Sequence, residues 1–154
     1  MFQASELDRK KDTKLADFLC FAVYSANLAF GKAYKPILDQ LGLTYTQYIA
    51  VVALWEQDNQ TVSDLGEKLF LESNTLTPLL KKLEAMGYVS RERDAANERH
   101  VRIKLTADGR HLREKAFDLS SPLFDACGLS TEGFNTTREA VVKVRDNLVK
   151  SITK

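Results

Sequence analysis

The sequence of 154 residues is poor in the residue types that build disulfide scaffolds and metal sites. Its two cysteines, Cys20 and Cys127, lie far apart, and so few cysteines do not make a disulfide framework for a chain of this size. Its two histidines, His100 and His111, are distant from both cysteines in the sequence. We therefore expect neither a zinc site nor a cofactor.

Long hydrophobic runs are also missing. No stretch of about 18 apolar residues is available to span a bilayer, and the N-terminus lacks the basic, apolar, small-residue pattern of an export leader. We therefore expect a protein of the reducing cytoplasm with no membrane contact. No internal repeat or linker divides the sequence, so a single domain, or one subunit of an oligomer, over residues 1–154 is expected.

The charge is nearly balanced overall but unevenly distributed. The formal net charge is +1, whereas residues 81–104 carry seven basic and four acidic side chains. A basic segment in a near-neutral protein is a modest indication of a polyanionic partner. On charge alone, a solvated charged surface explains the segment better.

Apolar residues recur with helical spacing over five stretches before residue 88. Gly42 is expected to end the second helix, Thr44 or Thr46 to cap the third, and Thr61 or Ser63 to cap the fourth. The predicted helices cover residues 14–30, 36–42, 45–57, 61–69 and 73–87.

The pattern then changes to the alternation that is typical of strands. Val101, Ile103 and Leu105 share one face of the second alternating run, and a polar, basic loop connects the two runs. Residues 88–94 and 100–106 are therefore predicted to form a β-hairpin with a charged tip.

Two further helices are predicted after the hairpin. Thr106 caps a long helix to about Ala126, which Pro122 either kinks or restarts, and a last helix covers about 136–152. The first and last helices carry more apolar surface than a small core covers, which favours a dimer. The apolar stripe of the last helix consists of Val141, Val144, Leu148 and Ile152.

The order helix, short turn, helix and hairpin predicts a mainly α fold with a small β-hairpin wing, the winged helix-turn-helix. In this fold the second helix enters the DNA major groove, and the hairpin reaches the backbone or the minor groove. Short polar side chains and lysines suit base edges and phosphates, and Arg99 at the wing tip suits minor-groove insertion. Taken singly, each candidate also has an ordinary role as a cap or a solvated residue. The candidate DNA contacts are Ser73, Asn74, Thr75, Thr77, Lys81, Lys82, Arg93, Asn97 and Arg99.

One local conflict concerns Pro78 in the second helix of this motif. If Ser73 caps the helix, the proline lies inside it and a backbone hydrogen bond is lost. The same rules allow the helix to begin at Pro78 after a Thr77 cap.

A second candidate site lies in the first predicted helix, "DFLCFAVYSANLAF". At helical spacing, Asp17, Cys20, Tyr24 and Asn27 share one polar face. A lone helical cysteine is most often a small buried hydrophobe. Tyr24 could donate a hydrogen bond to a thiolate at Cys20, whereas a carboxylate at Asp17 would disfavour that thiolate. The spacing alone leaves the role of Cys20 open.

The segment "TVSDLGEKLFLESNTLTPLLKKLEAMGYVSRERDAANERHVRIKLTADG" resembles the central part of the MarR family of dimeric winged-helix regulators. "LCFAVY" and "LFLESNTLTPLLKKLE" are similar to its OhrR branch, repressors that sense organic hydroperoxides. The resemblance covers roughly residues 15–120 and implies a winged helix over about 46–105, with dimerisation helices at about 10–42 and 107–153. It also implies Thr-Pro within the recognition helix. Asn97 departs from the family, where the wing commonly has Asp.

The OhrR resemblance implies a thiol switch. In that branch a reactive cysteine, here Cys20, is held by tyrosines from the other subunit, which correspond to Tyr34 and Tyr45. Some members carry a second cysteine, matched by Cys127, which resolves the oxidised thiol as an intersubunit disulfide. The implied protein is a homodimeric repressor that releases double-stranded operator DNA when an organic hydroperoxide oxidises Cys20.

Two other functions compete with this expectation. A MarR-type repressor could instead be released by a small phenolic ligand, without thiol chemistry. A cysteine peroxidase is a third possibility, but no Arg lies near Cys20 in the sequence and no thioredoxin-type motif is present. We therefore do not expect an enzyme.

Overall fold

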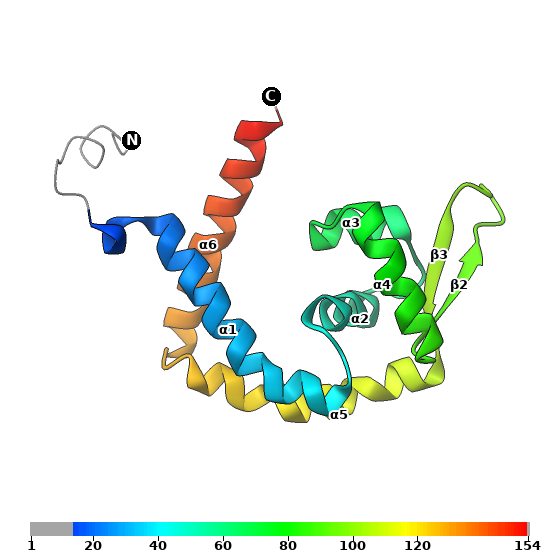
Figure 1. Ribbon diagram of the computed structural model, residues 1–154, viewed down its shortest axis with the longest axis horizontal. Coiled ribbons are helices and arrows are strands. Elements are labelled where there is room, and N and C mark those ends of the chain that lie inside the picture. Colours follow the sequence, from blue (N-terminus) through cyan, green and yellow to red (C-terminus); the bar gives the residue numbers. More distant parts are fainter. Residues whose placement is uncertain (1–13, 154) are drawn as a thin grey trace. The chain divides into compact units, whose positions relative to one another are not determined.

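The computed structural model of the protein describes residues 14–153 and is mainly helical with one small antiparallel sheet, as predicted. The chain forms two compact units, Met1–Arg113 and Glu114–Lys154. The predicted start of the first dimerisation helix, near residue 10, lies outside the described residues. None of the helices within residues 14–153 combines the length and the apolar character of a membrane span. The elements are η1 (Leu15–Asp17), α1 (Leu19–Leu41), α2 (Tyr45–Glu56), β1 (Gln60–Thr61), α3 (Val62–Leu69), α4 (Ser73–Ala85), β2 (Val89–Arg93), β3 (Val101–Leu105), α5 (Ala107–Ala126) and α6 (Thr131–Ile152) (Figure 1).

The first long helix differs from the prediction, because α1 is continuous where two helices were expected. Pro36 lies inside it, where a proline costs about 3 kcal/mol. Ile37, Leu38 and Leu41 directly after the proline are buried, and burial of such a side chain contributes about 1.5–3 kcal/mol. Burial therefore outweighs the cost of the proline. The predicted end at Gly42 is confirmed, with φ at 68°.

The beginning of α1 also differs from the prediction. Leu15–Asp17 form a 3-10 turn, and Phe18 is extended with φ −84° and ψ 120°. The Asp17 carboxylate accepts a hydrogen bond from the backbone N–H of Lys14 at 3.1 Å. The expectation that Asp17 lies on one helical face with Cys20 is therefore wrong, because the helix begins only at Leu19.

The helix-turn-helix consists of α3 and α4. Thr61 rather than Ser63 caps α3, since its hydroxyl accepts from the Asp64 N–H at 3.1 Å. The alternative of a start at Pro78 is wrong, because α4 begins at Ser73. Ser73 is not its cap, however, since Glu72 occupies that position and makes no side-chain capping bond. Pro78 lies inside α4, as the family resemblance implied.

The wing is a three-stranded sheet in the order β1–β3–β2. The predicted hairpin is confirmed, with Arg91 opposite Ile103 in its register. The short strand β1 was not predicted, because two residues are too few to show an alternating pattern. It pairs with β3 through Gln60 opposite Ile103 and Thr61 opposite Arg102.

The core of the winged helix lies between α2, α3, α4 and the sheet, which gather together in Figure 1. Leu54 of α2, Leu65 of α3 and Ile103 of β3 are fully buried. The apolar face of α4 is buried as well, through Leu76, Leu79, Leu80 and Leu83. The opposite, polar face of α4 is thereby left at the surface.

The two C-terminal helices largely follow the prediction. The Thr106 hydroxyl caps α5 by accepting from the Gly109 N–H at 3.1 Å. The helix continues through Pro122 to Ala126. The last helix begins at Thr131, earlier than the predicted 136, because Ser130 caps it by accepting from Gly133 N–H at 3.1 Å.

Candidate functional site

The polar face of α4 presents most of the predicted DNA contacts. Ser73, Asn74 and Thr75 in its first turn are exposed, and Thr77 is half-buried. The side chains of Lys81 and Lys82, further along the helix, are exposed too. Because the leucines of α4 anchor its other face, this surface can enter a groove of DNA without unpacking the core.

A surface groove runs between this helix and the wing. It contains three of the predicted residues, Ser73, Thr77 and Arg99. The other predicted residues do not line it, namely Asn74, Thr75, Lys81, Lys82, Arg93 and Asn97. The other polar side chains of the groove were not predicted as DNA contacts. On an alternating strand or a short helix, such side chains have the same pattern as ordinary solvent-exposed residues. The lining residues are Thr61, Val62, Ser63, Ser73, Thr77, Arg91, Arg99, His100 and Val101.

Arg91 is the least expected residue of this groove. Its side chain is 21% exposed, and its guanidinium lies 3.7 Å from the Glu84 carboxylate, beyond hydrogen-bond distance. Its Nε is buried and has no hydrogen-bond partner among the described residues. The groove therefore contains a half-buried arginine, Arg91, in addition to Arg99 at the wing tip.

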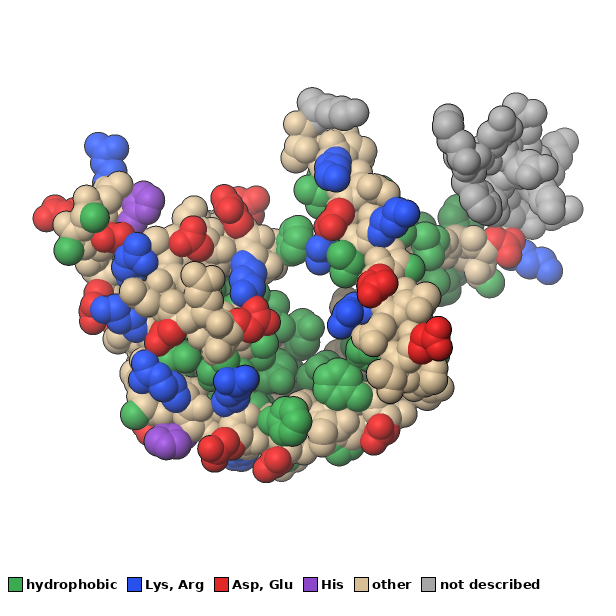
Figure 2. Space-filling view, turned by 180° about the vertical axis from the view of Figure 1, so that it is seen from behind, with side chains coloured by type: hydrophobic (Ala, Val, Ile, Leu, Met, Phe, Trp, Pro, Cys, Tyr) green, Lys and Arg blue, Asp and Glu red, His purple; other side chains and the backbone are tan. Residues whose placement is uncertain are grey.

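The basic residues of the segment 81–104 are either ion-paired or unpaired, and Arg91 belongs to the paired group through Glu84. Arg102 and Lys104 are ion-paired with Asp94 and Glu92, at 2.9 and 2.8 Å. Lys81, Lys82, Arg93 and Arg99, all predicted DNA contacts, form no ion pair within residues 14–153. Basic and acidic side chains are interspersed on the face shown in Figure 2. The segment thus offers a few unpaired cations to a polyanion rather than a broad basic surface.

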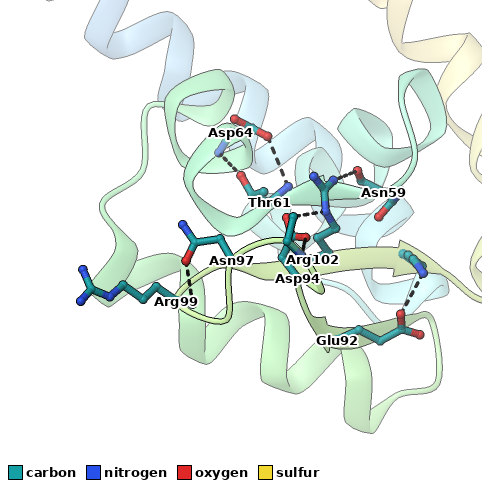
Figure 3. Close-up of polar contacts among 10 residues, drawn as sticks. Asn59, Thr61, Asp64, Glu92, Asp94, Asn97, Arg99 and Arg102 are labelled. Atoms are coloured by element: carbon teal, nitrogen blue, oxygen red, sulfur yellow. Dashed lines mark hydrogen bonds and ion pairs between the residues drawn. The ribbon is translucent and has the colours of Figure 1, made fainter.

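The wing tip is built by backbone hydrogen bonds around Asn97. Its N–H donates to the Asp94 carbonyl at 3.2 Å, and its carbonyl accepts from His100 N–H at 2.9 Å. Its side-chain oxygen accepts from the Arg99 N–H at 3.2 Å. Figure 3 shows the Arg99 side chain extending away from these contacts. Asn97 therefore supports the turn that carries Arg99. The guanidinium of Arg99 makes no polar contact within the described residues.

The root of the wing is held by Asp94. Its carboxylate accepts from Ala96 N–H at 2.9 Å and from Arg102 Nε at 2.9 Å. The backbone hydrogen bond from Ala96 is the main cause that holds the pKa of Asp94 below its ordinary value of 3.8, and Arg102 and His100 add to it. The carboxylate is thus ionised at neutral pH.

The two cysteines belong to different units of the chain. Cys20 on α1 is an exposed free thiol, and Tyr24, one helical turn later, is 58% exposed. Cys127, just after α5, is a free, half-buried thiol whose Sγ lies 3.5 Å from the Leu123 carbonyl. The exposure of Cys20 is inconsistent with a buried core residue and meets one requirement of a reactive thiol. Within the described residues, no cluster of His, Cys, Asp and Glu could hold a metal ion.

Tyr34 and Tyr45, the two tyrosines that the family resemblance singled out, lie next to each other. Their ring centroids are 5.4 Å apart in an edge-to-face arrangement, and Tyr48 extends the cluster at 6.0 Å from Tyr34. The two tyrosines border a hollow of about 560 Å³ between α1 and the start of α2. It is lined by Asn27, Leu28, Phe30, Gly31, Lys32, Tyr34, Lys35 and Tyr45.

Comparison with known proteins shows to which family this winged helix belongs. Residues 32–116 match the family model of the transcriptional regulator SarA/Rot. The chain is 41% identical over 135 residues to the organic hydroperoxide resistance transcriptional regulator of Bacillus subtilis, with 88% of this chain and 92% of the relative covered.

Solved structures agree. Reduced AbfR bound to DNA, a protein of Staphylococcus epidermidis, aligns with a TM-score of 0.77 at 36% identity, over 90% of this chain and 94% of that one. MarR of E. coli shares the fold, with a TM-score of 0.69 at 22% identity over 82% of this chain and 96% of that one. The chain therefore belongs to the MarR family of winged-helix transcriptional regulators, in its OhrR branch.

Proposed function

We propose that this protein is a repressor that binds operator DNA as a homodimer and releases it when an organic hydroperoxide oxidises Cys20. The observation that carries the proposal is the exposed, unpaired thiol of Cys20 in a chain 41% identical to an organic hydroperoxide resistance regulator. Reduced AbfR, which aligns with this chain at a TM-score of 0.77, is known bound to DNA, which supports DNA binding by this protein. In this proposal α4 reads the major groove and Arg99 enters the minor groove.

The homodimer in this proposal rests on unpartnered apolar surface in the described helices. Leu19 and Val23 on α1, Phe117 on α5 and Leu148 and Ile152 on α6 are between 41% and 80% exposed. A soluble monomer rarely leaves so much apolar helix in water. We propose that the helices within 10–42 and 107–153 bury this surface against a second copy, which gives the two recognition helices needed for half-sites one DNA turn apart.

The proposed chemistry begins with the Cys20 thiolate. The sulfur attacks the distal oxygen of the hydroperoxide, the O–O bond breaks, and the alkoxide leaves as an alcohol after taking up a proton. Cys20 becomes a sulfenic acid, oxidised by two electrons. Tyr24 on the same helix face, and Tyr34 and Tyr45 of the partner copy, are the proposed hydrogen-bond donors to the sulfur.

The second step would use Cys127 of the partner copy. Its sulfur attacks the sulfenic sulfur of Cys20, the S–O bond breaks, and water leaves as the disulfide forms. A cellular thiol can reverse this bond. AbfR is known with a disulfide formed, and in the reduced and overoxidised states on DNA, which supports thiol chemistry in this branch.

The disulfide is proposed to act on DNA binding through the geometry of the dimer. A disulfide brings two Cα atoms within about 7 Å, so it constrains the helices that carry the two winged helices. A hundredfold loss of affinity requires that the DNA-bound state be disfavoured by only about 2.7 kcal/mol.

Non-reducing electrophoresis tests the resolving step. Treatment with cumene hydroperoxide is expected to give a covalent dimer of the wild-type protein and of neither Cys20→Ser nor Cys127→Ser. Dithiothreitol should return the dimer to monomer. A covalent dimer that survives in Cys127→Ser would remove Cys127 from the proposal.

The hollow beside Tyr34 and Tyr45 favours one alternative, release by a small phenolic ligand. Its lining surface is mostly apolar, and its polar groups are the tyrosine hydroxyls, Asn27 and the ammonium groups of Lys32 and Lys35, which suits a small aromatic molecule with an acidic group. Salicylate, as a probe, would then release DNA equally from wild-type protein and from Cys20→Ser.

A further inference from the structure

We propose that Arg102 is a positioning residue, which fixes the wing against the turn before the helix-turn-helix and thereby sets where Arg99 meets DNA. This inference rests on the proposed DNA-binding function and adds a residue to it. In the sequence, Arg102 is one of the basic residues of the segment 81–104, and no local pattern indicates its hydrogen-bond partners.

The guanidinium of Arg102 bridges two segments that are distant in the sequence. Its Nε donates to Asp94 at 2.9 Å, at the root of the wing, and its Nη1 donates to the Asn59 carbonyl at 3.0 Å, in the turn before β1. Both contacts are drawn in Figure 3. One side chain thus joins the hairpin to the segment that leads into α3.

The Asp94 end of this bridge is continuous with the wing tip. Asp94 N–H donates to the His100 carbonyl at 2.8 Å, and its carbonyl accepts from Asn97 N–H at 3.2 Å. Asn97 in turn accepts from Arg99 N–H through its side chain. A chain of hydrogen bonds therefore connects Arg102 to the backbone of the residue proposed to enter the minor groove.

The Asn59 end is equally well held. Asn59 has a φ of 58°, a left-handed conformation that asparagine tolerates better than most residues, and its N–H donates to Asp58 at 2.7 Å. Gln60 and Thr61 of β1 follow directly, and Thr61 caps α3. The bridge therefore ends two residues before the cap of the helix-turn-helix.

The wing needs such a bridge because its sheet gives little support near the tip. From Val101 to the tip, no third strand of residues 14–153 pairs with the hairpin, since β1 reaches only Ile103 and Arg102 on β3. A two-stranded hairpin alone is marginally ordered in water. Without the bridge, the tip residues would adopt many positions, and ordering Arg99 on DNA would cost binding free energy.

Arg102 is not simply another phosphate ligand, because two of its donors are already engaged and its partner Asp94 is only 14% exposed. An electrostatic role and a positioning role of Asp94 predict opposite changes in DNA affinity when its carboxylate is removed. Removal of a carboxylate from a surface that faces DNA should strengthen binding by electrostatics alone. If Asp94 holds the wing, Asp94→Ala should instead weaken binding.

The experiment uses a duplex that the wild-type protein selects from random-sequence DNA, with the Kd measured by fluorescence anisotropy. Asp94→Ala and Arg102→Gln are each expected to weaken binding about three- to tenfold. Arg102→Lys should not restore affinity, because an ammonium group lacks the planar fork that reaches both partners. Glu92→Gln is the matched control, since Glu92 pairs only with Lys104 on the exposed side of the hairpin, and it should leave the Kd unchanged or lower it.

A double-mutant cycle with Arg99→Ala tests whether Arg102 acts through Arg99. If it does, Arg102→Gln has little further effect once Arg99 is alanine. Additive losses, full rescue by Arg102→Lys, or tighter binding by Asp94→Ala would each overturn the inference. Failure to select any duplex, or no effect of Arg99→Ala alone, would count against the proposed DNA-binding function instead.

Amide hydrogen exchange tests the bridge without DNA. The amides of Ala96, Asn97 and His100 donate hydrogen bonds in the wing and should exchange at least threefold faster in Arg102→Gln, while those of α2 remain unchanged. Unchanged exchange of the three wing amides would overturn the inference, whatever the protein binds.

Discussion

The indole N–H of Trp55 donates a hydrogen bond to the Gly109 carbonyl at 2.8 Å, which ties α2 to the first turn of α5. The ion pair of Arg110 with Asp58 at 3.0 Å lies beside this contact. The helix that leads away from the winged helix is thus firmly attached at its start. In the proposed mechanism, any movement of α5 on disulfide formation is passed to the DNA-binding elements through this junction.

Gly109→Ala should destabilise the fold. A Cβ at this position would lie 2.1 Å from the Tyr88 carbonyl oxygen, so the backbone must shift. We expect a loss of about 1–3 kcal/mol or more in the free energy of unfolding, measured with urea. Gly31→Ala is the control, because nothing lies within 4 Å of its Cβ position, and in a helix it should be neutral or add about 0.5–1 kcal/mol. Equal effects of the two substitutions would contradict this packing.

Trp55→Phe should weaken the same junction by a smaller amount. The ring of phenylalanine retains most of the packing, but the Gly109 carbonyl loses a side-chain donor. We expect about 1 kcal/mol of destabilisation in urea unfolding. No change at all would mean that water replaces the indole N–H without cost.

Thr61→Ala and Ser63→Ala form a second matched pair. Thr61 caps α3 and should cost about 1 kcal/mol on truncation, whereas the exposed Ser63 has no capping role and should cost almost nothing. Thermal unfolding of the two variants measures the difference. A larger loss in Ser63→Ala would contradict the observed start of α3.

The order of the longer helices and of the wing hairpin was predictable, because each has a local signal, whereas the short elements η1 and β1 have none. The alternation of Val101, Ile103 and Leu105 gave the wing, and Gly42 gave the end of α1. The continuity of α1 through Pro36 was not predictable, because it depends on the burial of the residues that follow. Rules based on local sequence include the free-energy cost of a proline in a helix, but they do not include the burial of side chains in the folded protein.

The candidate site was predictable in part for the same reason. Exposed polar residues of α4 and Arg99 at the wing tip follow from the motif alone. The bridge of Arg102 to Asn59 joins residues 43 positions apart, which no local pattern indicates. Arg91 resembled its charged neighbours on β2, and only the structure shows that its Nε is buried.

The lowered pKa of Asp94 predicts a pH dependence of stability. Because its folded pKa lies below the ordinary value of 3.8, the ionised form stabilises the native state above pH 3.8. This contribution is lost as the pH falls below 3.8 through the folded pKa. Asp94→Asn should therefore be less stable than wild type at pH 6, and the gap in urea midpoint should narrow between pH 4 and pH 2. A constant gap over this range would exclude a titrating contribution from Asp94.

Whether Cys20→Ser keeps its DNA when a hydroperoxide is added decides whether oxidation of Cys20 causes the release. The fraction of labelled, selected duplex bound is measured by anisotropy before and after one equivalent of cumene hydroperoxide per subunit. We expect that the affinity of wild-type protein falls about a hundredfold, that dithiothreitol restores it, and that Cys20→Ser keeps its DNA throughout. Release of DNA from Cys20→Ser by the hydroperoxide, to the same extent as from wild type, would contradict this expectation.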